Sequence, residues 1–168
     1  WGVIALLVII ILLLIPGPLR WVIEQSVGFY RGVITEPLYK VDTYTHQEAQ
    51  TILEQNGIRI ESTGNCSDIN NKNCTSLEGM PKKVINQLII AKNECGCNVT
   101  ITGGTETGHE EHGPARPVVD LKYQPGDANG EKLRNYLKTN QTRLEIKKII
   151  DTPHGTGPHI HIAFYGDA

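Results

Sequence analysis

The sequence has few aromatic residues and no excess of positive charge. Aromatic residues make up only 6% of the 168 positions, so we expect a core built mainly from isoleucine, leucine and valine. Lysine and arginine together number 16, against 18 aspartate and glutamate residues, and the formal net charge is -2. The sequence also lacks a basic stripe interleaved with aromatic residues, which is the usual footprint of nucleic-acid binding. The composition therefore argues against a nucleic-acid partner.

The first segment lacks charge entirely. Residues 1–19 contain no charged side chain, and a membrane span needs about 20 mostly apolar residues. The alternative is the h-region of a secretory signal, which would end at a small-residue cleavage site, but only Pro-Gly-Pro follows Ile15. We therefore expect an uncleaved transmembrane anchor at 1–19. Because the chain begins with Trp1 rather than Met, we also expect it to be processed or fragmentary.

The remaining length allows one compact domain but not two. Residues 20–45 mix aromatic, charged and apolar side chains with little periodicity, which is typical of a juxtamembrane connector. The folded domain is predicted to span 46–168.

The four cysteines all lie beyond the anchor, within a 32-residue window. An even number of cysteines beside an anchor indicates disulfides in an oxidising compartment, so we expect the domain on the extracytoplasmic side of the membrane. Because only one residue separates Cys95 from Cys97, the sequence favours crossed disulfides from Cys66 and Cys74 onto these two.

Two alternatives to this interpretation stay open. The four thiolates could instead hold a structural zinc ion, although the sequence lacks the Cys-x-x-Cys spacing typical of such sites. A cytoplasmic domain is favoured by Arg20 and Arg31, which follow the anchor, under the positive-inside rule.

Hydrophobic periodicity predicts the secondary structure of the domain. Helical spacing of apolar residues predicts three helices. Thr45 is expected to cap the first, and Pro81 restricts the regular part of the second to the residues that follow it. The predicted helices span 45–55, 76–93 and 131–138, and the predicted strands span 58–62, 98–102, 118–121, 144–150 and 159–165. This order predicts an α+β fold, with a small, largely antiparallel sheet and flanking helices.

Histidines gather late in the chain, where five of the six fall between residues 109 and 161. In the run from His159 to Ile162, alternation places His159 and His161 on one face of a strand. Two neighbouring imidazoles can be two metal ligands, or one ligand beside a catalytic base. A polar strand face turned to solvent is the simplest alternative.

A second half of a metal site is predicted around Asp120. Asp120 lies inside the apolar run 118–121, where an unpaired carboxylate would be costly. A metal ion is the simplest cation for it, and Arg116 is the alternative partner. His112 precedes it by a loop rich in glycine and proline, which can fold the imidazole back towards the carboxylate.

With these residues in this order, the sequence resembles the zinc peptidase superfamily of D-Ala-D-Ala carboxypeptidases and dipeptidases, to which the hedgehog signalling domain is structurally related. That family carries a His, an Asp a few residues later, and a late His-x-His or a carboxylate with Trp-His. The resemblance runs from Cys97 to Phe164, and more weakly includes the helix beginning at Leu77. It implies that zinc is held by His112, Asp120 and His161, and that a catalytic His159 handles the proton.

The sequence departs from the family's pattern at the ligands. His112 and Asp120 stand one residue further apart than the family's spacing, which makes His109 an alternative first ligand. His159 replaces the carboxylate usual before the last ligand, a variant that some peptidases of the family share.

A further departure concerns the substrate. Active relatives carry an arginine for it after the first strand, whereas residues 102–107 contain none. Arg116 is the predicted substitute, and His154, on a glycine-rich turn, is a second candidate for substrate contact.

The resemblance implies a membrane-anchored zinc metallopeptidase that hydrolyses amide bonds of peptidoglycan stem peptides, as a D,D- or L,D-carboxypeptidase or endopeptidase. Three protein ligands leave the fourth zinc position for water, whose pKa zinc lowers to about 7. The predicted proton carriers for this zinc-activated water are His159, Glu110 and Glu111.

Two other functions remain open. The missing arginine and the extra residue favour an inactive, zinc-stabilised binding module of a cell-surface or secretion assembly. A disulfide-stapled surface domain without metal would require the histidine spacing to be accidental.

Overall fold

A computed structural model describes residues 41–61, 66–108, 110–151 and 157–166. The elements in chain order are β1 (Thr43–Tyr44), α3 (His46–Gln55), β2 (Arg59–Ile60), β3 (Met80–Pro81), α4 (Lys82–Cys95), β4 (Thr100–Gly103), β5 (Val118–Lys122), α5 (Ala128–Thr139), β6 (Ile146–Ile150) and β7 (His159–Phe164). Within these described ranges, no helix is long and apolar enough to cross a membrane. The anchor predicted at 1–19 lies outside them.

Five strands form one mixed sheet in the order β2-β4-β5-β7-β6. β2 and β4 are parallel, whereas the other three neighbouring pairs are antiparallel. β1 and β3 form a separate two-stranded sheet. The predicted α+β class is therefore confirmed, and the sheet is mixed because of the single parallel pair at its β2 edge.

The predicted helix boundaries follow from identifiable capping groups. At α3, the Thr45 side chain accepts from the Glu48 N–H, and the Glu48 carboxylate accepts from the Thr45 N–H, 2.9 Å away, which is a capping box. α4 begins directly after Pro81, as predicted. α5 begins three residues earlier than predicted, because the Asp127 carboxylate caps it by accepting from the Gly130 N–H at 2.7 Å.

The two-stranded sheet was not predicted. Thr43 and Tyr44 fall in the predicted connector, yet they pair with Pro81 and Met80. A strand of two residues is too short to leave an alternating pattern in the sequence.

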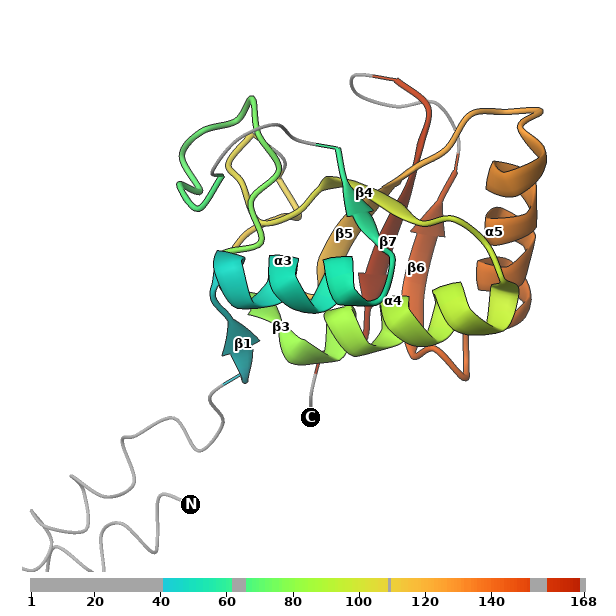
Figure 1. Cartoon of the computed structure of the whole chain (residues 1–168), viewed down its shortest axis with the longest axis horizontal. Helices are drawn as coiled ribbons and strands as arrows, with labels where there is room; N and C mark the ends of the chain where they lie inside the picture. Colours follow the sequence, from blue (N-terminus) through green and yellow to red (C-terminus); the bar gives the residue numbers. More distant parts are fainter. Residues whose placement is uncertain (1–40, 62–65, 109, 152–156, 167–168) are drawn as a thin grey trace, which may run out of the picture. The chain divides into compact units, whose positions relative to one another are not determined.

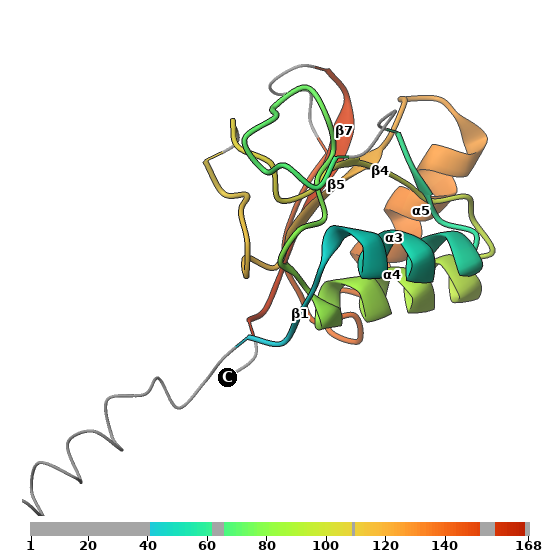
Figure 2. The ribbon, with the colours of Figure 1, turned by 60° about the vertical axis from the view of Figure 1, so that its left-hand side comes forward.

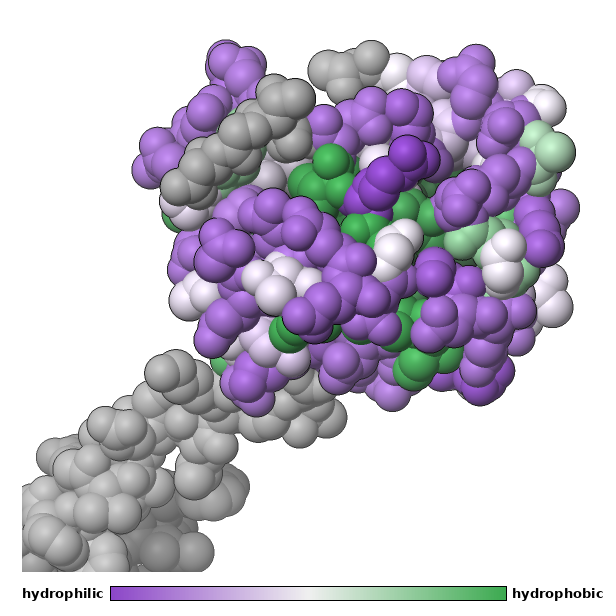
Figure 3. Space-filling model, viewed as in Figure 1, coloured by the Kyte–Doolittle hydropathy of each residue, from purple (hydrophilic) through white to green (hydrophobic). Residues whose placement is uncertain are grey.

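The helices α3 and α4 lie side by side on one face of the large sheet, and the loop between β4 and β5 lies on the other side (Figures 1 and 2). Val119 and Leu121 of β5, with Ile160 and Ile162 of β7, point into the core under the helices. Alternation along the strands therefore directs Asp120, His159 and His161 to the opposite face. The helix side is covered mainly by hydrophilic side chains, with apolar atoms visible only in breaks between them (Figure 3).

The cysteines form two disulfides, but the predicted crossed pairing is wrong. Cys66 pairs with Cys74, and Cys95 pairs with Cys97. Gly96 explains the second pair, because its left-handed backbone (φ 59°) turns the chain at the end of α4. The Cα atoms of Cys95 and Cys97 thereby come within 5.1 Å, a separation that disulfides span readily. Two disulfides suggest an extracytoplasmic domain, in line with the expectation from the sequence.

Candidate metal centre

The pairing of β5 with β7 builds most of the centre. The antiparallel register places Asp120 opposite His161 and Lys122 opposite His159, so these side chains share the face of the sheet away from the helices. His112 reaches the same place from the loop between β4 and β5. Two adjacent strands and one loop thus bring together residues that are far apart in the sequence.

His112, Asp120 and His161 form a buried group whose potential ligand atoms lie within 4.8 Å of one another. Asp120 Oδ1 is 2.8 Å from His161 Nδ1 and 3.4 Å from His112 Nε2. The two ring nitrogens, His112 Nε2 and His161 Nδ1, are 3.4 Å apart. The group can therefore hold a metal ion.

The donor set and its spacing suit zinc. Two imidazole nitrogens and one carboxylate oxygen are ordinary zinc ligands, and ligand atoms at the usual zinc bond lengths stand about 3.4 Å apart in a tetrahedron. The three candidate ligand atoms form a triangle, and the two distances from His112 Nε2, to His161 Nδ1 and to Asp120 Oδ1, have this length. The third, from Asp120 to His161, is a hydrogen-bond distance of 2.8 Å, so it would have to open slightly around an ion.

Electrostatics couple the members of the group. Burial alone would raise the pKa of the Asp120 carboxyl, but hydrogen bonds from His112 and His161 outweigh it and hold that pKa well below its ordinary value. Burial would lower the pKa of His112, whereas the Asp120 carboxylate raises it, and the net shift is upward from 6.5. Without metal, the buried carboxylate is thus compensated by its contacts with the two histidines. A metal ion bound to these ring nitrogens would replace those contacts.

The loop that carries His112 is fixed by its backbone. His112 Nδ1 donates to the Gly104 carbonyl at 2.6 Å, which leaves Nε2 to face the group. The Gly104 N–H in turn donates to the buried Glu106 carboxylate at 3.0 Å. Glu106 also accepts from the Ser76 N–H at 2.8 Å. Its carboxylate therefore joins the loop that carries His112 to the segment that precedes β3 and α4.

The adjacent glycines leave no room for side chains. A Cβ at Gly103 would lie 2.7 Å from Asp120 Oδ2, and one at Gly104 would lie 2.0 Å from the Ser76 carbonyl oxygen. The sequence pattern contained no signal for these close contacts or for the burial of Glu106, because both depend on residues distant in the sequence.

His159 lies beside the three-residue group. Its Nδ1 donates to the Gly157 carbonyl at 2.8 Å, and its Nε2 is 3.7 Å from Asp120 Oδ2. His159 and Asp120 line a cavity of about 320 Å³ together with Lys122 and Tyr123. Of the three metal-capable residues, Asp120 is the one that lines this cavity.

The remaining predicted site residues are placed elsewhere. Arg116 Nη1 donates to the Glu110 carbonyl at 2.7 Å, and both residues line a different cavity, next to β6. The Asp120 carboxylate makes its ion pairs with histidines, rather than with Arg116 as the alternative proposed. His109 and His154 lie outside the described residues.

A larger cavity of about 540 Å³ lies beside α3 and is lined in part by His46, Arg59 and Asn98. None of the three metal-capable residues lines it. We therefore place the candidate site at the smaller cavity, where the chemistry is concentrated.

Comparison with protein-family models finds no match, and neither do searches of curated proteins and of solved structures. The family resemblance therefore depends on the order and spacing of the residues quoted above.

Proposed function

We propose that this protein is a membrane-anchored, zinc-dependent peptidase that acts on amide bonds of peptidoglycan stem peptides outside the cytoplasm. The observation that supports it best is the convergence of His112 Nε2, Asp120 Oδ1 and His161 Nδ1 beside an accessible cavity. Three protein ligands with the fourth position left for water are the arrangement of catalytic rather than structural zinc sites, and Asp120 is the member of the group that lines the cavity. A zinc ion bound there would supply the Lewis acidity that activates water and polarises an amide carbonyl.

His159 is the proposed proton carrier. Its Nδ1–H is held by the Gly157 carbonyl, so the neutral ring presents Nε2 as the nitrogen that accepts a proton. That nitrogen faces the Asp120 side of the group and the cavity that the substrate would enter. An imidazole can take a proton and return it to the leaving amine near neutral pH.

Glu111 has no comparable position. Its carboxylate contacts the outer nitrogen of His161, Nε2, at 2.9 Å and Lys148 at 2.7 Å. Glu110 is exposed and contributes its carbonyl to Arg116. His159 is thus the favoured proton carrier of the three that the sequence suggested.

One observation favours the second candidate, a zinc-stabilised binding module without hydrolysis. Among the described residues that line the cavity, Lys122 is the only lysine or arginine, and its ammonium is bonded to Glu61 at 2.7 Å. A substrate carboxylate would have to compete for this cation. A binding module has no such requirement.

Metal analysis combined with hydrolysis of muropeptides and of a D-amino-acid dipeptide tests the proposal. We expect about one zinc ion per chain and hydrolysis that is lost in His159→Ala although zinc is retained. Zinc without turnover on any of these substrates would replace the peptidase with the binding module. A protein that binds no divalent metal ion would contradict both functions.

A further inference from the structure

The outer face of His161 carries a second carboxylate that no ligand role explains. Asp120 Oδ1 lies 2.8 Å from the inner nitrogen, Nδ1, whereas Glu111 Oε2 lies 2.9 Å from Nε2 on the opposite side of the ring. The imidazole is therefore held between two carboxylates.

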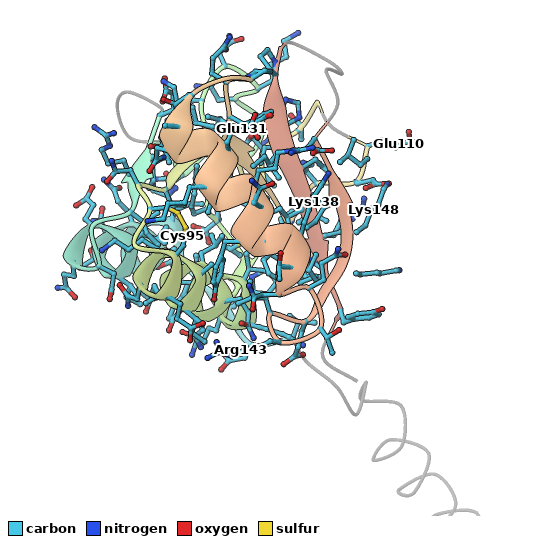
Figure 4. All side chains as sticks on the ribbon, turned by 90° about the vertical axis from the view of Figure 1, so that its right-hand side faces the viewer. Cys95, Glu110, Glu131, Lys138, Arg143 and Lys148 are labelled. Atoms are coloured by element: carbon cyan, nitrogen blue, oxygen red, sulfur yellow. A yellow bond between two sulfur atoms is a disulfide. The ribbon has the colours of Figure 1, made fainter. Side chains whose placement is uncertain are left out.

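The two carboxylates differ in their surroundings. The Asp120 side chain is 5% exposed and that of Glu111 is 48% exposed. Glu111 is also held from its other oxygen, because Lys148 Nζ of β6 contacts Oε1 at 2.7 Å. Lys148 lies at the same edge of the domain as the loop that contains Glu110 (Figure 4). Asp120 is thus one of the three metal-capable residues, whereas Glu111 contacts this group from outside, through the Nε2 of His161.

This arrangement determines which nitrogen of His161 can face a metal ion. Once a metal takes one ring nitrogen, the ring keeps a single N–H, and that N–H needs an acceptor. Nδ1 is the nitrogen that lies 3.4 Å from His112 Nε2, so it is the one that points into the group. The N–H must then be on Nε2, where the Glu111 carboxylate accepts it.

We infer that Glu111 is a positioning residue of the metal centre, which holds His161 in the tautomer and ring orientation that turn Nδ1 to the metal, with Lys148 orienting Glu111. The inference rests on the metal-binding part of the proposed function, but it does not depend on hydrolysis. Carboxylates that accept from a metal-bound histidine increase the basicity of the ring, and losing such a partner typically lowers metal affinity about 10–100-fold.

Zinc affinity, measured by competition with a chromogenic chelator, is the first readout. We expect Glu111→Ala to lower the affinity about 10–100-fold. Glu111→Gln keeps an acceptor for Nε2–H while it removes the charge, so we expect it to restore most of that loss. Glu110→Ala is the matched control, since it removes the same charge from the neighbouring exposed position and should leave the affinity unchanged. Lys148→Met should cause a smaller loss than Glu111→Ala.

The visible spectrum of the cobalt-substituted protein is the second readout, because it reports ligand geometry independently of activity. We expect the Glu111→Ala spectrum to change and the Glu111→Gln spectrum to stay close to that of the wild type. Since Glu111 is exposed, all variants should fold, and circular dichroism of the metal-free proteins checks this.

The outcomes distinguish a failure of the positioning role from a failure of the metal centre itself. Equal zinc affinity of Glu111→Ala and the wild type would overturn the positioning role and leave the zinc site intact. Complete loss of metal binding in both Glu111→Ala and Glu111→Gln would also overturn it, because Glu111 would then be a direct ligand. A wild-type protein that binds neither zinc nor cobalt would overturn both the inference and the metal centre.

Discussion

Asp120 of β5 and His161 of β7 lie directly opposite each other across an antiparallel strand pair, with Oδ1 2.8 Å from Nδ1. The pairing register fixes this contact, since a slip of one residue along β7 would turn His161 into the core below the helices while Asp120 kept its face. The backbone of the sheet thus determines two of the three ligands before any metal binds, and only His112 depends on a loop.

Removing one strand ligand should abolish metal-dependent stabilisation. Zinc at a hundred times its dissociation constant should stabilise the wild-type protein by about 2.7 kcal/mol, and a chelator should reverse this. We expect His161→Ala and Asp120→Asn to show no such increase, whereas His159→Ala should retain it because His159 lies outside the ligand triangle. Thermal melts with zinc and with chelator measure the effect. A full zinc response in His161→Ala would exclude this histidine as a ligand.

A methyl group at Gly104 should damage both the fold and the centre. The added Cβ would lie 2.0 Å from the Ser76 carbonyl oxygen, so the loop must move, and overpacking of this kind costs about 1–3 kcal/mol. Because the Gly104 carbonyl holds His112, zinc affinity should fall as well. Urea unfolding and zinc titration of Gly104→Ala measure the two losses.

The matched control for this change is Gly166→Ala, since nothing lies within 4 Å of a Cβ at Gly166. If both variants were equally stable and bound zinc equally well, the close contact of Gly104 would have no energetic consequence.

Alternating and helical patterns in the sequence predicted the parts of the fold that depend on neighbouring residues. The face of β7 followed from the alternation that places His159 and His161 together, whereas β5 was predicted only as an apolar run that contains Asp120. The direct opposition of Asp120 and His161 did not follow, because the sequence does not determine the pairing register of distant strands. The disulfides failed for a related reason, since the left-handed turn at Gly96 was not anticipated. The contact between Glu111 and His161 joins a loop to a strand 50 positions later, and local patterns carry no information on such pairs.

Acid should destabilise the domain partly through His46. The Nδ1 of this buried histidine accepts from the Leu77 N–H at 3.0 Å, so a proton on Nδ1 would abolish the bond. Burial, offset in part by Glu78, lowers the pKa of His46 below 6.5. The folded state thus binds the proton less readily than the unfolded state. The resulting stability is fully present above the unfolded pKa of about 6.5 and is lost as the pH falls through the folded pKa.

Urea unfolding of the wild type and of His46→Asn, across this pH range and with chelator present, isolates the effect. Asparagine offers an acceptor to Leu77 but does not titrate, so we expect a smaller loss of stability on acidification in the variant. Parallel pH dependences of the two proteins would show that another group is responsible. The titrations of His112 and Asp120 are common to both proteins and cancel in the comparison.

The two disulfides should contribute unequally to stability. In the chain-entropy view, a cross-link stabilises more when it closes a longer loop, and Cys66–Cys74 spans eight positions whereas Cys95–Cys97 spans two. We expect the double substitution of Cys66 and Cys74 by alanine to cost roughly 2–3 kcal/mol, and that of Cys95 and Cys97 roughly 1–2 kcal/mol.

The longer disulfide should also matter for the metal centre. The Thr107 N–H donates to the Ile69 carbonyl at 2.7 Å, which joins the segment closed by Cys66 and Cys74 to the loop that carries His112. Loss of this cross-link should therefore lower zinc affinity, whereas loss of Cys95–Cys97, at the far end of α4, should leave it nearly unchanged. Unfolding curves and zinc titrations of the two double variants give both quantities. The reverse order, with the shorter disulfide controlling zinc affinity, would contradict the connection through Ile69, because α4 would then have to transmit the effect to a group on the opposite face of the sheet.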